Sequence, residues 1–103
     1  MQLYFSCNYI IYVLHLSMSK AEKLIQRLRN YPKDFTYVEL RKILFHFGYE
    51  EIKTGKTSGS RVAFYREESR HIIRLHKPHP KPILKEYQIQ MSIKELSNQN
   101  LLL

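Results

Sequence analysis

The stretch RVAFYREESRHIIRLH, residues 61–76, decides the fold, because it holds two short runs of β-branched and aromatic residues around a polar tip. In each run two large apolar side chains fall on alternate positions, Val62 and Phe64 in the first and Ile73 and Leu75 in the second, which is the pattern of a strand that buries one face. The four residues 67–70 between the runs are polar and suit a turn. The sequence therefore predicts an antiparallel hairpin of strands 61–66 and 71–76.

A four-residue tip also sets the register of this hairpin. It gives three outward-facing pairs: Tyr65 with Ile72, Ala63 with Arg74, and Arg61 with His76. Directly opposed Cβ atoms lie roughly 4.5–5.5 Å apart, so the side chains of one face form a continuous surface. The outer face is then predicted to carry two guanidinium groups, an aromatic ring and an imidazole: Arg61, Arg74, Tyr65 and His76. Lys77 and His79 stand at the edge of this face.

Two capping boxes upstream of the hairpin mark the starts of two helices. Ser19 and Thr36 are each followed three residues later by a glutamate, and apolar residues at helical spacing come after each box. Tyr31-Pro32 ends the first helix and Gly48 caps the second, since proline cannot continue a helix and glycine suits a C-terminal cap. Residues 49–53 are then predicted as the first strand.

The chain after the hairpin is predicted to be a loop followed by one helix. Three prolines in residues 77–82 exclude regular structure there. Residues 83–96 are predicted as the last helix, with Leu84, Tyr87 and Met91 inward. The element order is ααβββα. We expect an α+β fold in which helices cover one face of a three-stranded antiparallel sheet.

The composition favours an anionic partner. The chain of 103 residues has 17 Lys+Arg against 9 Asp+Glu and a formal net charge of +8, and residues 53–85 hold nine basic but only two acidic side chains. Nucleic acid is the first candidate, and an anionic membrane surface or an acidic protein is the second. The one cysteine, Cys7, excludes an intramolecular disulfide and a zinc site of paired cysteines, in keeping with a reducing cytoplasm.

Residues 1–17 contain no Lys, Arg, Asp or Glu. They lack the basic start and the small-residue cleavage site of a secretory signal, and they are too short for a membrane span. We predict that Met18 is the natural start, that residues 1–17 are a dispensable extension, and that residues 18–103 form a single domain. A real added strand or helix and a targeting segment are the alternatives.

His76 and His79 are the candidate catalytic side chains, and they flank Lys77 in the proline-rich segment. Imidazole titrates near pH 6.5, so it can both accept and donate a proton near neutral pH. RNA supplies its own nucleophile, the 2′-hydroxyl, so proton transfer with cationic stabilisation of the phosphorane needs no metal and no cofactor. A structural or phosphate-contacting role is an alternative for both histidines. Metal binding is a weaker one, because no acidic or cysteine partner lies nearby in sequence.

Other chemistry finds less support in the sequence. His71 opens the second strand of the hairpin beside the polar tip, and we expect it to be solvated. The chain has no phosphate-binding loop of the Walker type, no Gly-x-Gly-x-x-Gly and no nucleophile elbow.

Three short motifs point to a family. They are Gly48-Tyr49 after the second helix, the Gly59-Ser60 turn that enters Val62-Ala63-Phe64, and the run His79-Pro80-Lys81-Pro82-Ile83-Leu84-Lys85. Through them residues 36–96 resemble the HicA toxins, the mRNA-cleaving members of bacterial toxin–antitoxin pairs. The resemblance implies a double-stranded-RNA-binding-like fold, mRNA endonuclease activity and a HicB-type antitoxin as partner. The first helix is an addition to the usual core of the family.

The resemblance has one departure at its catalytic motif. The usual motif is Gly-Ser-His with a catalytic histidine, whereas this chain has Gly59-Ser60-Arg61. A guanidinium group cannot act as a base near neutral pH. Either the chemistry has moved to His76 or His79, or the protein binds RNA without cutting it.

We therefore predict a cytoplasmic mRNA endonuclease that needs neither metal nor cofactor and is neutralised by an antitoxin. A non-catalytic RNA-binding module is the main alternative, and a DNA-binding regulator is a further one. The predicted RNA contacts come from the hairpin and its flanks: Lys56, Ser60, Arg61, Tyr65, Arg74, Lys77 and Lys81.

Overall fold

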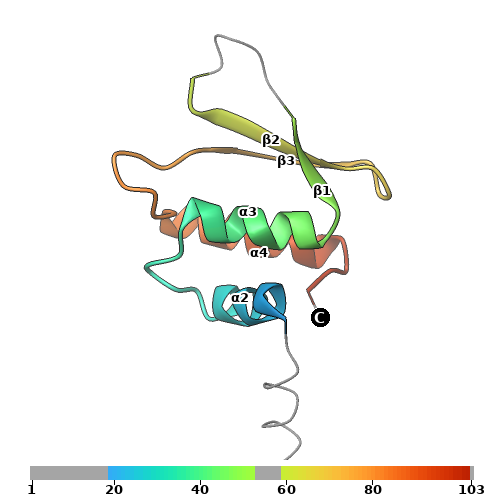
Figure 1. Cartoon of the computed structure of the whole chain (residues 1–103), viewed down its shortest axis with the longest axis horizontal. Coiled ribbons are helices and arrows are strands. Elements are labelled where there is room, and N and C mark those ends of the chain that lie inside the picture. Colours follow the sequence, from blue (N-terminus) through green and yellow to red (C-terminus); the bar gives the residue numbers. More distant parts are fainter. Residues whose placement is uncertain (1–18, 53–58, 103) are drawn as a thin grey trace, which may run out of the picture.

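The computed structural model describes residues 19–52 and 59–102, which form three helices and three strands (Figure 1). Their bounds are α2 (Lys20–Arg29), α3 (Tyr37–His46), β1 (Tyr49–Ile52), β2 (Arg61–Arg66), β3 (His71–His76) and α4 (Glu86–Asn98). The predicted α+β class and the order ααβββα are confirmed. None of the helices in the described part of the chain is long and apolar enough to cross a membrane.

The helices lie on one side of the sheet, as expected, but in two layers rather than one (Figure 1). Helix α3 packs against β1 and α4 packs against β3, whereas α2 packs against α3 and α4 behind them. The core fills the space between these layers: Leu28 of α2, Leu40 of α3 and Phe64 of β2 are each fully buried. The first helix is therefore an integral third layer of the domain.

The sheet has the strand order β1-β2-β3 with antiparallel pairing throughout. The three predicted pairs occur in the predicted register: Tyr65 with Ile72, Ala63 with Arg74, and Arg61 with His76. Ala63, which was predicted to face outward, is nevertheless buried at 4% exposure. On the inner face Val62, Phe64, Ile73 and Leu75 are buried, in keeping with the alternation in the sequence. Because the register is correct, the composition of the outer face follows directly from it.

Both predicted capping boxes are present. The Ser19 hydroxyl accepts a hydrogen bond from the Glu22 amide at 3.2 Å, and the Thr36 hydroxyl accepts one from the Glu39 amide at 3.1 Å. Gly48 follows the end of α3 with φ of 92°, in the left-handed region that glycine occupies without steric cost. The sequence thus correctly predicted the helix ends that are set by hydrogen bonds or backbone conformation within a few residues, namely the starts of α2 and α3 and the end of α3.

The predicted last helix is wrong at its N-terminus. Helix α4 begins at Glu86 rather than Ile83, because residues 82–84 form an extended segment paired with the entry to α3. The Leu84 amide donates to the Phe35 carbonyl at 2.8 Å, and Ile83 forms a bridge with Thr36.

The inward face of α4 differs from the predicted one accordingly. Tyr87, expected inward, is 59% exposed. The buried positions of the helix are Gln88, Ile89, Ser92 and Leu96, while Met91 is only partly buried against the core. Two of the four buried residues are polar. The spacing of apolar residues in the sequence therefore predicted a different buried face of the helix from the one observed.

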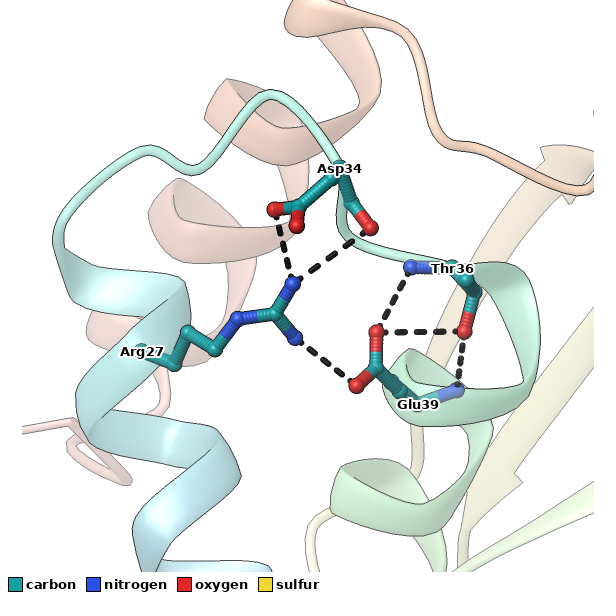
Figure 2. A network of polar contacts seen from close by, with 4 residues as sticks. All are labelled: Arg27, Asp34, Thr36 and Glu39. Carbon is teal, nitrogen blue, oxygen red and sulfur yellow. Dashed lines mark hydrogen bonds and ion pairs between the residues drawn. The ribbon is translucent and has the colours of Figure 1, made fainter.

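A polar network joins α2 to the start of α3 (Figure 2). The Arg27 guanidinium donates to Asp34 Oδ1 and to Glu39 Oε2, each at 2.7 Å, and its carbon lies 5.0 Å from the centroid of the Phe35 ring. The other oxygen of Glu39 accepts from the Thr36 amide at 2.9 Å, completing the capping box of α3. Arg27 therefore clamps the added helix onto the segment that pairs with residues 82–84.

Candidate functional site

A polar hollow of about 240 Å³ opens where β3 ends and α4 begins. It is lined by the Gly-Ser turn before β2, the end of β3, the following loop and the first turn of α4: Ser60, His76, Lys77, Pro78, His79, Lys85, Tyr87 and Gln88. We call this the His76 hollow. Four residues predicted from the sequence meet in it, namely Ser60, His76, Lys77 and His79. With Lys85, two imidazole groups and two ammonium groups line the hollow beside its polar side chains.

The ring of His76 is held at one nitrogen. Ser60 Oγ lies 3.3 Å from His76 Nδ1, and the side chain of His76 is exposed. Among the described residues no hydrogen bond engages Nε2. When Nδ1 carries the proton and donates to Ser60 Oγ, the lone pair of Nε2 faces solvent and can accept a proton. This geometry makes Ser60 an orienting group for the imidazole.

Lys77 is positioned by a hydrogen bond of its backbone amide and by an aromatic ring that lies under its side chain. Its amide donates to the Ser60 carbonyl at 2.8 Å, so the Gly-Ser turn supports both His76 and Lys77. Its Nζ lies 5.6 Å from the centroid of the Tyr37 ring, an arrangement in which the ring face attracts the cation. Burial raises the pKa of Tyr37 to about 12. The ring therefore stays neutral beneath the Lys77 ammonium at physiological pH.

The loop that carries His79 is anchored to α3. The Tyr37 amide donates to the Pro82 carbonyl at 2.9 Å, next to the pairing of residues 83 and 84 with 35 and 36. His79 itself is exposed and precedes a cis peptide bond to Pro80. The proline-rich loop is thus tied at its far end to the same segment that Arg27 clamps.

The remaining predicted RNA contacts lie outside the hollow. Arg61 is exposed and pairs with His76 across the strands, and Arg74 is exposed further along β3. Lys81 is exposed in the loop. Lys56 lies outside the described residues.

Tyr65 shares the outer face with Arg61 but stands at its opposite end. The four-residue separation corresponds to roughly 13 Å along a strand. Tyr65 is half-buried, and its partner on β1 is Glu50. The outer face therefore has a cationic end beside the His76 hollow and a mixed end beside the tip.

Apart from Pro78 in the loop, three lining residues were not among the predicted site residues: Lys85, Tyr87 and Gln88. Each lies at the start of α4, so the displaced helix boundary concealed them. Lys85 is the N-cap rather than a helical residue, and Tyr87 points outward rather than into the core. The Pro82-Ile83 step is the one local signal for the later start, because proline and the residues around it favour extended backbone.

The expectation that His71 is solvated is wrong. Its side chain is 16% exposed, and its two nitrogens contact the Tyr49 hydroxyl at 2.7 Å and Glu95 Oε1 at 3.1 Å. The beginning of β3 packs beneath α4, which brings Glu95 within reach. Burial also raises the pKa of Tyr49. His71 is consequently a structural link between β1, β3 and α4.

No group of three or more His, Cys, Asp or Glu side chains within residues 19–52 and 59–102 could hold a metal ion. The hollow instead gathers two imidazole and two ammonium groups around one space. Such a set suits an anionic ligand, because each group can donate a hydrogen bond and the two ammonium groups carry positive charge.

The fold and the hollow define a small α+β domain with a cationic, histidine-lined site at one end of its sheet. Residues 37–97, well over half of the chain, match the family model of the HicA toxin of bacterial toxin–antitoxin systems. The chain therefore belongs to the HicA toxin family, as the toxin member of a toxin–antitoxin pair. The match begins at the first residue of α3, so α2 lies outside it. No curated protein and no solved structure matches the chain.

Proposed function

We propose that this toxin is a metal-independent endoribonuclease that binds and cleaves mRNA and is neutralised by a HicB-type antitoxin. The observation that carries the proposal is the His76 hollow, in which two histidines and two lysines line one space. Family membership supports the toxin role. The chemistry of the hollow supports RNA as the target.

The proposed reaction is an attack of the RNA on itself. The 2′-hydroxyl oxygen bonds to the adjacent phosphorus, and the bond from phosphorus to the 5′ oxygen of the next nucleotide breaks. His76 Nε2 takes the 2′-hydroxyl proton, and His79 gives a proton to the departing 5′ oxygen. The products are a 2′,3′-cyclic phosphate and a free 5′-hydroxyl, so the reaction needs no water in this step and no metal.

The cations around the hollow have a separate task in this scheme. Lys77 and Lys85 line it, and Arg61 lies directly across the strands from His76. Positive groups aimed at the phosphorane stabilise the charge that develops in the transition state. A guanidinium group stays charged and can donate bidentate hydrogen bonds to two phosphate oxygens. Arg61 therefore binds the phosphate at the position where the usual family motif has its histidine.

The RNA strand continues, in this proposal, over the cationic end of the outer face. Arg74 is exposed on β3, Lys81 is exposed in the loop that follows it, and Lys56 belongs to the same basic stretch of sequence. Contacts of this kind bind the phosphate backbone without reading the sequence. Because mRNA is the proposed substrate, the cytoplasm is the proposed place of action.

The second candidate function is a non-catalytic RNA-binding module of the same fold. The observation that favours it is Arg61, since this position lacks the proton-transferring group of the usual family motif. Such a module would retain the cationic surface while leaving the RNA intact.

Cleavage in chelator distinguishes the two functions. The purified chain is incubated with an mRNA fragment in EDTA, and the product ends are identified as cyclic phosphate or not. His76→Ala and His79→Ala should each slow cleavage by about 10²–10⁴-fold, the usual effect of losing one acid–base group. RNA affinity, measured alongside, should change only a few-fold. His46→Ala is the matched control, because His46 is exposed at the end of α3 and does not line the hollow.

Two outcomes would contradict the nuclease proposal. Full activity in the double variant His76→Ala/His79→Ala would remove histidine from the mechanism. Tight binding without any cleavage by the unaltered chain would establish the RNA-binding module instead. The antitoxin is tested separately: a short acidic protein encoded beside this chain should relieve growth arrest on co-expression and co-purify with it.

A further inference from the structure

Gln88 is a polar side chain in a position where α4 otherwise meets the core. It is 2% exposed, and its neighbour Ile89 and the residue four positions on, Ser92, are buried with it. Buried amides are retained in proteins when their hydrogen bonds are satisfied. The hydrogen bonds of the Gln88 side chain therefore indicate its role.

Both ends of the Gln88 amide are engaged within the candidate site. Nε2 donates to the carbonyl oxygen of His76 at 2.8 Å, and Oε1 accepts from the Lys85 amide at 2.9 Å. The side chain thus connects the last residue of β3 to the residue that caps α4. Both of these residues line the hollow.

The carbonyl of His76 and the amide of Lys77 belong to one peptide group, and that group is held from two sides. Gln88 holds its oxygen, and the Ser60 carbonyl accepts from its N–H at 2.8 Å. A planar peptide gripped at both polar atoms cannot rotate without breaking a hydrogen bond. The directions in which the His76 ring and the Lys77 side chain leave the backbone depend on that rotation.

We propose that Gln88 is the positioning residue of the His76 hollow, which locks the His76–Lys77 peptide so that the imidazole and the ammonium converge on one phosphate. This inference rests on the proposed nuclease function and deepens it. Gln88 touches neither the substrate nor the reacting atoms. It acts through the backbone, while Ser60 acts on the imidazole directly.

The test replaces Gln88 in the full chain and separates positioning from folding. Gln88→Met keeps the length and the helix propensity of the side chain but removes both hydrogen bonds. Gln88→Glu keeps an acceptor for the Lys85 amide but loses the donor to His76. Gln90→Met is the matched control, because Gln90 is exposed two residues further along the same helix and its side chain donates to Glu86 Oε1 at 3.4 Å, away from the hollow.

We expect Gln88→Met and Gln88→Glu to lower kcat by about 10–100-fold with KM changed less than about 3-fold, since a displacement of about 1 Å can cost about 10²-fold in rate. Amide exchange at Lys77 should become faster in both variants, whereas Gln90→Met should match the unaltered chain in every measurement. A merely structural residue would instead lower the melting temperature and the fraction of active protein, and leave kcat per active molecule unchanged.

Each variant can overturn the proposed positioning role of Gln88. Unchanged kcat in Gln88→Glu or in folded Gln88→Met overturns the positioning role. If Gln88→Met does not fold, Gln88→Glu alone decides, and loss of folding in both shows a purely structural residue. Absence of cleavage by the unaltered chain is a different result, because it overturns the nuclease function itself and with it any role in positioning catalysis.

Discussion

Replacement of Glu39 by alanine tests how firmly the added helix is joined to the rest of the domain. Glu39 has two duties: it closes the capping box of α3 by accepting from the Thr36 amide at 2.9 Å, and it pairs with Arg27 of α2 at 2.7 Å. Loss of a capping interaction costs about 1 kcal/mol, and loss of a partly exposed ion pair costs about 0.5–1 kcal/mol. We expect Glu39→Ala to lower the free energy of unfolding by about 1.5–2 kcal/mol.

The chain supplies its own control for this experiment. Glu22 closes a chemically equivalent capping box with Ser19 at the start of α2, but it is exposed and makes no ion pair to another helix among the described residues. Urea unfolding at pH 7, followed by circular dichroism, gives the free energy for both variants. The difference between Glu39→Ala and Glu22→Ala measures the link between helices. If the two variants lose equal stability, the ion pair between Arg27 and Glu39 contributes nothing to the stability of the fold, contrary to the prediction.

The pH dependence of the same variant gives an independent check. Burial acts to raise the pKa of Glu39, but hydrogen bonds from Thr36 and the Arg27 guanidinium outweigh it and hold the pKa below its ordinary value of 4.5. The carboxylate therefore contributes its full stability above about pH 4.5 and loses it as the pH falls through the lowered pKa. The unfolding curves of Glu39→Ala and the unaltered chain should converge in acid. A stability gap of constant size down to pH 2 would contradict this assignment.

Three further predictions concern the surface, the termini and the backbone. RNA affinity should fall steeply with salt, with a log–log slope of roughly −0.7 to −0.9 per phosphate contact, and Arg74→Ala or Lys77→Ala should flatten that slope; an unchanged slope in both would put the RNA elsewhere. A chain that starts at Met18 should unfold at the same urea concentration as one with residues 1–17, and a loss of several kcal/mol would make that segment part of the core. Gly48→Ala should destabilise the fold by about 1–2 kcal/mol through its φ of 92° alone, because an added Cβ would find only ordinary contact, and equal stability of the two chains would refute this.

The features that depend on neighbours in sequence were predictable. The two Ser/Thr-x-x-Glu boxes fixed where α2 and α3 begin, because a capping hydrogen bond spans only three residues. The alternation of residues 61–66 and 71–76 and the length of their tip determined the register, since a slip by one residue would turn every apolar side chain outward. From that register, Arg61 and His76 could be paired in advance.

The features that depend on contacts distant in sequence were decided by the tertiary structure. Helix α4 starts at Glu86 because the backbone of residues 82–84 bonds to residues 35–37 instead of to its own next turn. That shift turns Tyr87 outward and Gln88 inward, onto the carbonyl of His76. His71 is likewise buried only because α4 brings Glu95 to it. The local pattern could suggest which residues carry the chemistry, but packing between layers determined which of them face one another, since hydrogen bonds between distant segments leave no periodic trace in the sequence.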